Sequence, residues 1–282
     1  YSHIHTISWS PDANMATPQM SMKQGIKVFK QDAVDAVSIE IKQLHDRTVM
    51  APKHSKELTP EQRKEALAYL MFLKRKRTGQ VKARGCADGR KQREYTDPDD
   101  ATSPTVATEA VFLLAVIAAL EHRDVAIVDV PGAFMQVDMV DELVHVRLTG
   151  IMVDILLKLD YEMYSPYVKQ EGKEKVLYCE LLKALYGTLR VARLFWEKLS
   201  GKLQEWGFEL NPYDSCVANK TINGKQCTIG WHVDDLHISH VESDVVDQVI
   251  DMMDKEFGKE TPLTKSRGKV HDYLGMTFDY ST

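Results

Sequence analysis

Two adjacent aspartates, Asp234 and Asp235, lie between two short apolar runs in residues 229–239. Both flanks alternate apolar residues with polar or small ones, which is the period of a β-strand. Neighbouring side chains of an unbroken strand point to opposite faces, so a tight turn is needed to bring both carboxylates to one site. The sequence therefore predicts a β-hairpin whose tip carries a divalent-metal site. Asp-Asp pairs are also common in surface turns, and that interpretation stays open at this point.

A third aspartate, Asp129, follows the apolar residues 126–128. Pro131 and Gly132 follow it and end regular strand pairing. Asp129 precedes Asp234 by 105 residues. This separation excludes a local calcium loop, which has its ligands within about a dozen positions. A carboxylate at a strand end is well placed to share a metal ion with the hairpin, so we expect the fold to assemble the site.

Several segments show the apolar periodicity of helices, and they surround the aspartate segments in the sequence. They are residues 34–44, 59–73, 106–120, 195–206 and 245–257. The second of these opens with Thr59 and Gln62 in the positions of a capping box. The third is apolar around most of its circumference, which predicts a buried helix leading into the strand of Asp129. Helices backing a small antiparallel sheet predict an α+β fold.

Composition limits the classes of protein that the chain can belong to. With 282 residues, 44% of them hydrophobic, it is long enough to bury a sizeable core. The longest apolar run, residues 110–120, is too short to cross a bilayer, and the first residues lack a secretory pattern. Four scattered cysteines favour reduced thiols in an intracellular protein over disulfides or a structural zinc site. A first residue other than Met suggests a piece of a longer polyprotein.

Positive charge is concentrated in one segment, although the formal net charge is -5. The basic residues of this segment are Lys74, Arg75, Lys76, Arg77, Lys82, Arg84, Arg90, Lys91 and Arg93. Such a block can neutralise phosphates and make binding depend on salt. The alternative is a solvated helix end followed by a basic loop. Charge alone does not choose among the nine side chains.

Six motifs follow one another along the chain. They are Lys82-Ala83-Arg84, Ser103-Pro104, residues 129–134, Ala184-Leu185-Tyr186-Gly187, residues 232–235 and Tyr273-Leu274-Gly275. In type, order and spacing they resemble the motifs of the reverse transcriptase domain of copia-type (LTR) retrotransposon polyproteins. The resemblance covers most of the chain.

The resemblance implies a fold and a division into parts. The fold is the right-hand polymerase arrangement of fingers and palm, in which the palm is a small antiparallel sheet backed by helices and the thumb is largely absent. The implied parts are residues 1–102 as N-terminal extension and fingers, 103–137 as palm with the first Asp motif, 138–186 as a fingers insertion, and 187–282 as palm with the hairpin.

The resemblance also implies an activity, that of an RNA-directed DNA polymerase, a nucleotidyltransferase that uses two Mg²⁺ ions or, alternatively, Mn²⁺. Asp129 and Asp234 would be the principal metal ligands, with Asp235 nearer the primer end. Lys82 and Arg84 would hold the triphosphate of the incoming nucleotide. The implied partners are an RNA template, a DNA or RNA primer, deoxynucleoside triphosphates and other domains of the polyprotein. Association with a membrane is not expected. The implied location is a cytoplasmic virus-like particle.

Four further residues carry expectations of their own. By the resemblance, Phe134 would be a steric gate against the ribose 2′-hydroxyl, whereas an aromatic residue after a strand is ordinarily core. His232 stands where the family usually has Tyr, and we leave it off the metal ligands. Arg190 stands where the family commonly has a nucleotide-contacting Gln, and Arg could grip phosphate there instead. Val233, if it lies in the hairpin turn, is expected to be strained.

Two other functions remain open from the sequence. One is a catalytically inactive, nucleic-acid-binding remnant of such a domain, which the intact set of three acids argues against. The other is a metal-dependent phosphohydrolase with the same acids. The basic hairpin and the sugar gate argue against it, because attack by water needs neither a primer groove nor selection of deoxyribose.

Overall fold

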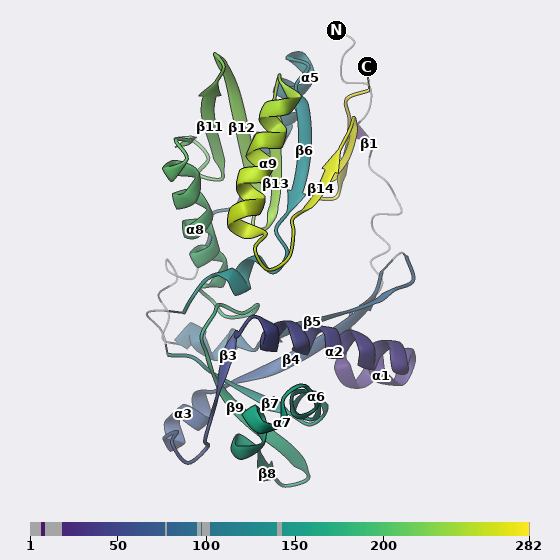
Figure 1. Cartoon of the computed structure of the whole chain (residues 1–282), viewed down its shortest axis with the longest axis vertical. Helices are drawn as coiled ribbons and strands as arrows, with labels where there is room; N and C mark the ends of the chain where they lie inside the picture. The colour runs from purple at the N-terminus through teal and green to yellow at the C-terminus, as the bar shows by residue number, and fades with distance from the viewer. Residues whose placement is uncertain are drawn as a thin grey trace. The chain divides into compact units, whose positions relative to one another are not determined.

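The computed structural model describes residues 7–8, 19–76, 78–94, 97, 102–139 and 143–281. The chain forms two compact units that are interleaved in sequence. Unit 1 consists of Tyr1–Ala16, Ser103–Ala133 and Ala192–Thr282, and unit 2 consists of Thr17–Thr102 and Phe134–Val191. Figure 1 shows the helices and strands of both units. The assignment of these units to palm and fingers stays a prediction.

Unit 1 is built on a six-stranded sheet in which all neighbouring strands are antiparallel. In spatial order its strands are β10 (Glu209–Leu210), β11 (Val217–Ile222), β12 (Lys225–His232), β13 (Asp235–His240), β6 (Asp124–Asp129) and β14 (Thr264–Arg267). A smaller sheet contains β1 (Ile7–Ser8), β16 (Met276–Asp279) and β15 (Val270–Tyr273). Strands β6 and β13 are therefore direct neighbours in the sheet, although their first residues, Asp124 and Asp235, are 111 positions apart in the sequence (235 minus 124).

Three helices of unit 1 confirm the helical segments expected from the sequence. They are α5 (Thr108–Leu120), α8 (Val191–Glu205) and α9 (Ser243–Phe257). The apolar stripe of α9, which includes Val245, Val249 and Met253, is buried and packs against β6 and β13 (Figure 1). This packing supports the two strands that carry Asp129 and Asp235.

The expectation that α5 is buried around most of its circumference is wrong in part. Leu114 is buried beside Gly230 of β12, but Leu113 and Leu120 are 59% and 66% exposed. The reason is geometric, because a helix lying on a sheet is covered along one stripe only. Among the helices that the structure describes, none is long and apolar enough to span a membrane.

Unit 2 contains a mixed seven-stranded sheet. Its strands are β2 (Met20–Ser21), β4 (Leu67–Arg75), β7 (His145–Thr149), β9 (Glu174–Leu181) and β3 (Met50–Lys53) in spatial order, with β5 (Val81–Ala87) paired to β4 and β8 (Lys169–Glu171) paired to β9. The pair β4–β7 is parallel and the others are antiparallel. The β4–β5 hairpin carries the first part of the basic segment, including Lys82 and Arg84.

Helices of unit 2 pack on this sheet and on each other. They are α1 (Met22–Phe29), α2 (Gln31–Asp46), α3 (Pro60–Glu65), α6 (Ile151–Leu159) and α7 (Tyr161–Tyr164). The buried residues of α2 include Val37, Ile41 and Leu44, which confirms the helix expected over residues 34–44. Because α2 contacts both β5 and α6, it fixes the back of the basic hairpin to the core of the unit.

The helix expected over residues 59–73 is wrong beyond its first two turns. The capping box is confirmed, since Thr59 Oγ1 accepts from the Gln62 nitrogen at 3.1 Å and Gln62 Oε1 accepts from the Thr59 nitrogen at 2.9 Å. The helix ends at Glu65, and the apolar run that follows is strand β4. A run that is apolar at nearly every position suits a buried helix or a buried strand equally, and here pairing with β5 and β7 decides for the strand.

Candidate active site

The two aspartates lie at the tip of a β-hairpin, as expected. His232 of β12 is paired with Asp235 of β13, so Val233 and Asp234 form a two-residue turn. Val233 has φ +59° while Asp234 does not have a positive φ, which is the pattern of a type II′ turn. A β-branched residue held there costs about 1–3 kcal/mol. The strain expected at Val233 is confirmed.

Strand register brings Asp129 to this tip. Asp129 of β6 is the direct partner of Asp235 of β13, and the Val130 nitrogen donates to the Asp234 carbonyl oxygen at 3.0 Å. Side chains of directly opposed residues project from the same face of an antiparallel sheet. The fold therefore gathers three carboxylates from two distant segments at one end of the unit 1 sheet.

The electrostatics of the site show that the carboxylates interact. Burial, and after it the negative charges of Asp234 and Asp129, raise the pKa of Asp235 to about 6, while His232 acts in the opposite direction. Three neighbouring carboxylates repel one another in the absence of a counterion. A divalent cation would reverse that balance and favour the ionised form of all three.

The donor set fits a hard divalent cation, because Mg²⁺ prefers carboxylate oxygens. The side chains are not arranged around a common point, since within the described ranges no group of three or more His, Cys, Asp or Glu is set to hold a metal ion. The strands thus bring the correct donors into one neighbourhood. Closing them around an ion would require rotation of the carboxylate side chains.

Tyr273 supports the hairpin in a way that the sequence did not reveal. Its hydroxyl donates to the backbone oxygen of Asp235 at 3.4 Å, and its side chain is only 2% exposed. Leu274 and Gly275, which follow, have φ of +50° and +78° and form the two-residue turn between β15 and β16. The Tyr-Leu-Gly motif therefore places a buried tyrosine against the acid hairpin, a role that a local motif does not disclose.

Two other residues border the acids. Thr264 of β14 is paired with Asp129 on the side away from β13, and nothing in its local sequence pointed to this position. His232 faces Asp235 across the hairpin, and its Nδ1 is buried without a hydrogen-bond partner among the described residues. Because His232 lowers the pKa of Asp235, it acts as an electrostatic neighbour of the acids. The structure gives no reason to add it to the metal ligands.

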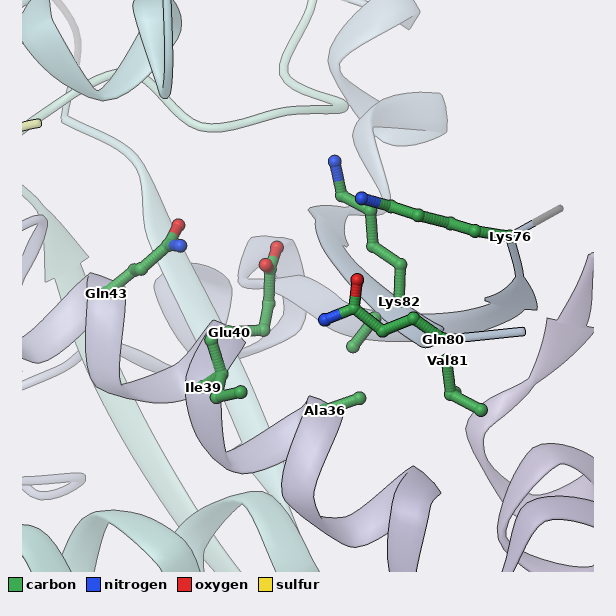
Figure 2. Close-up of a pocket in the computed structure, with 9 residues that line it drawn as sticks. Ala36, Ile39, Glu40, Gln43, Lys76, Gln80, Val81 and Lys82 are labelled. Carbon is green, nitrogen blue, oxygen red and sulfur yellow. The ribbon is translucent and has the colours of Figure 1, made fainter. Parts of the chain in front are cut away.

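In unit 2, Lys82 and Arg84 lie on β5, two residues apart, so their exposed side chains share one face of the hairpin. Lys82 lines a pocket of about 180 Å³ together with Lys76 and Gln80 of the hairpin and Glu40 of α2 (Figure 2). Glu40 accepts a hydrogen bond from the Gly85 nitrogen at 2.7 Å. Burial raises the pKa of Glu40, while its hydrogen bond with Gly85 and the charges of Lys82 and Arg84 lower it.

Arg84 and Phe134 meet on the same aromatic ring. The guanidinium carbon of Arg84 lies 5.4 Å from the ring centroid of Tyr186, and the Phe134 ring lies 4.5 Å from it, centroid to centroid, tilted by 57°. Phe134 is only 6% exposed. The position agrees with a packed aromatic residue, and its role as a sugar gate stays a prediction.

Two glycines allow the loop that carries Tyr186 to lie directly on the end of β5. The Ala87 nitrogen donates to the Tyr186 carbonyl oxygen at 2.7 Å. Gly187 has φ +91°, and a Cβ atom there would collide with the backbone oxygen of Ala87. A Cβ atom on Gly89, in the 3-10 helix η2 (Gly89–Glu94), would collide in turn with the Gly187 oxygen. Only glycine fits both positions.

Arg190 follows in the same loop of unit 2. Its Nε atom is buried and has no hydrogen-bond partner in the part of the chain that the structure describes. Its neighbour Leu189 is held by a hydrogen bond from its nitrogen to Oε1 of the fully buried Gln92 at 3.1 Å. The loop is thus fixed directly before Arg190. The expected contact of Arg190 with a nucleotide stays a prediction.

The predicted site residues therefore fall into two groups. Asp129, Asp234 and Asp235 come together in unit 1, whereas Lys82, Arg84, Phe134 and Arg190 belong to unit 2. A family model described as "Reverse transcriptase (RNA-dependent DNA polymerase)" matches residues 56–282, a range that contains all seven. A search of curated proteins returned no match.

Proposed function

Because the chain belongs to the reverse transcriptase (RNA-dependent DNA polymerase) family, we propose that it is the polymerase domain of a copia-type retrotransposon polyprotein. Its proposed reaction is the addition of deoxynucleotides to a primer 3′-hydroxyl on an RNA template. The observation that carries this proposal is the pairing of Asp129 with Asp235 beside the Asp234 turn. We assign unit 1 to the palm and unit 2 to the fingers on the basis of the motifs that each contains.

The proposed site uses two Mg²⁺ ions held by Asp129 and Asp234, with Asp235 closer to the primer end. When bound, such ions activate the attacking hydroxyl and stabilise the leaving pyrophosphate. The protein itself supplies positioning. The antiparallel pairing of β6 with β13 fixes the backbone positions of the acids relative to one another, and Tyr273 holds the Asp235 backbone, so only the carboxylate side chains have to adjust when substrates arrive.

The proposed nucleotide residues act through charge and shape. Lys82 and Arg84 project from one face of β5 and would bind the triphosphate, for which lysine provides a point charge and arginine a planar pair of donors. Arg190, with its unpartnered buried Nε, has a donor to offer to a phosphate oxygen. Phe134 would exclude a ribose 2′-hydroxyl. The support for these roles is the common location of the four side chains in unit 2.

Primer extension on an RNA template tests the proposed function. The protein is incubated with a labelled primer annealed to RNA and with all four deoxynucleoside triphosphates, first in Mg²⁺ and then in Mn²⁺. We expect template-directed extension that requires a divalent ion. If the protein binds the primer and template without extending the primer in either metal, it is an inactive remnant. Release of phosphate from nucleotides without a primer would instead identify a phosphohydrolase.

A further inference from the structure

Tyr186 contacts both Arg84 and Phe134, two side chains that have different roles in the proposed function. The guanidinium carbon of Arg84 lies 5.4 Å from the centroid of the Tyr186 ring, and the centroid of the Phe134 ring lies 4.5 Å from it. Arg84 is expected to bind the triphosphate and Phe134 to sense the sugar. The same aromatic ring therefore contacts both the phosphate-binding residue and the sugar-sensing residue.

The backbone of Tyr186 is held firmly enough to serve as a fixed support. Its carbonyl oxygen accepts from the Ala87 nitrogen, and the close approach at Gly187 and Gly89 leaves no room for the loop to shift toward β5. Ala87 lies on the same strand as Arg84. The ring and the guanidinium are consequently mounted on two segments that are hydrogen-bonded to each other.

Arg84 depends on such a support because it is exposed. A long side chain on a strand surface samples many rotamers, and an aromatic face restricts them by a cation–π contact. Phe134 depends on it differently. Its ring is nearly buried, and its tilted contact with Tyr186 fixes the position of the ring edge.

We propose that Tyr186 is a positioning residue that couples triphosphate binding by Arg84 to sugar selection by Phe134. This inference rests on the proposed polymerase function. It makes a specific claim about linkage, namely that a single substitution at Tyr186 alters two kinetic properties that separate substitutions at Arg84 and Phe134 alter one at a time.

The test compares Tyr186→Leu with Tyr186→Phe in single-nucleotide primer extension. In Tyr186→Leu, loss of the cation–π contact should raise the KM for the deoxynucleotide about fivefold with little change in kcat. Loss of the ring contact to Phe134 should lower discrimination against ribonucleotides about tenfold in the same variant. Tyr186→Phe keeps the ring and should retain wild-type values of both. Tyr167→Leu, a matched change at a half-buried tyrosine of unit 2 that stacks on His54, should alter neither.

A double-mutant cycle separates coupling from general damage. Adding Tyr186→Leu to Arg84→Ala should raise KM no further, because the contact is already absent. Unchanged KM and discrimination in Tyr186→Leu, or equal impairment in Tyr186→Phe, would overturn the inference. If the wild-type protein does not extend primers, the proposed function fails, and binding of a fluorescent deoxynucleoside triphosphate then tests the link to Arg84. Equal affinity of wild type and Tyr186→Leu in that measurement also overturns it.

Discussion

Asp234→Asn is expected to reduce RNA-templated primer extension by about 1000-fold, since a metal-binding carboxylate accounts for several kcal/mol of transition-state stabilisation. The substitution removes one negative charge and keeps the size of the side chain. It should leave the hairpin intact, because the Asp234 group bonded to Val130 is the backbone oxygen and Asn is well accepted in turns. The loss is therefore expected in the chemical step and not in folding.

The measurement is the single-turnover rate of extension at saturating nucleotide in Mg²⁺. Asp251→Asn, which removes an exposed carboxylate from α9, is the matched control and should extend at the wild-type rate. Thermal unfolding of both variants checks that the fold is preserved. An Asp234→Asn rate within about tenfold of wild type would exclude Asp234 as a principal metal ligand.

Asp235→Asn is expected to stabilise the metal-free protein at neutral and alkaline pH. The pKa of Asp235 is raised from its usual 3.8 to about 6, mainly by burial and then by the charges of Asp234 and Asp129. The native state therefore binds the proton more tightly than the unfolded state, and stability falls as pH rises from about 4 to about 6. Because the Asp235 carboxyl is partly solvated, its ionisation lowers the free energy of unfolding above about pH 6 by about 1–2 kcal/mol.

Urea unfolding in chelator-treated buffer at several pH values measures this effect. Near pH 8 the Asp235→Asn variant should be more stable than wild type, and near pH 4 the two should be equal. Saturating Mg²⁺ should reverse the order near pH 8, because the cation binds the three ionised carboxylates of the wild-type site more tightly than the two that the variant retains. A stability difference that is independent of pH between these limits would contradict the account.

The hairpin and its flanking helices were predictable because their information is local. The alternation around Asp234 and Asp235 requires a turn, and the stripe of Val245, Val249 and Met253 requires a helix with one buried face. The apolar run beginning at Leu67 carried no such information, since it suits a helix and a strand equally. Its partner strands, which lie elsewhere in the chain, decided its structure.

The assembly of the site depended on register, which the sequence does not encode locally. A strand ending in Asp129 could be anticipated, but its pairing with Asp235 is set by the whole unit 1 sheet. The same holds for Tyr273, whose contact with the hairpin arises from β15, and for the collision that requires glycine at both Gly187 and Gly89. These are contacts between distant segments.

Counting the bound metal ions tests most directly whether Asp129, Asp234 and Asp235 share one metal site. Mn²⁺ binding is measured by electron paramagnetic resonance of the free ion, with the protein bound to primer, RNA template and a non-hydrolysable deoxynucleotide. Two bound ions are expected for wild type, and an affinity lower by at least about tenfold for Asp129→Asn, because Asp129 and the hairpin share the ions. Identical ion number and affinity in wild type and Asp129→Asn would show that Asp129 does not share a metal site with Asp234 and Asp235.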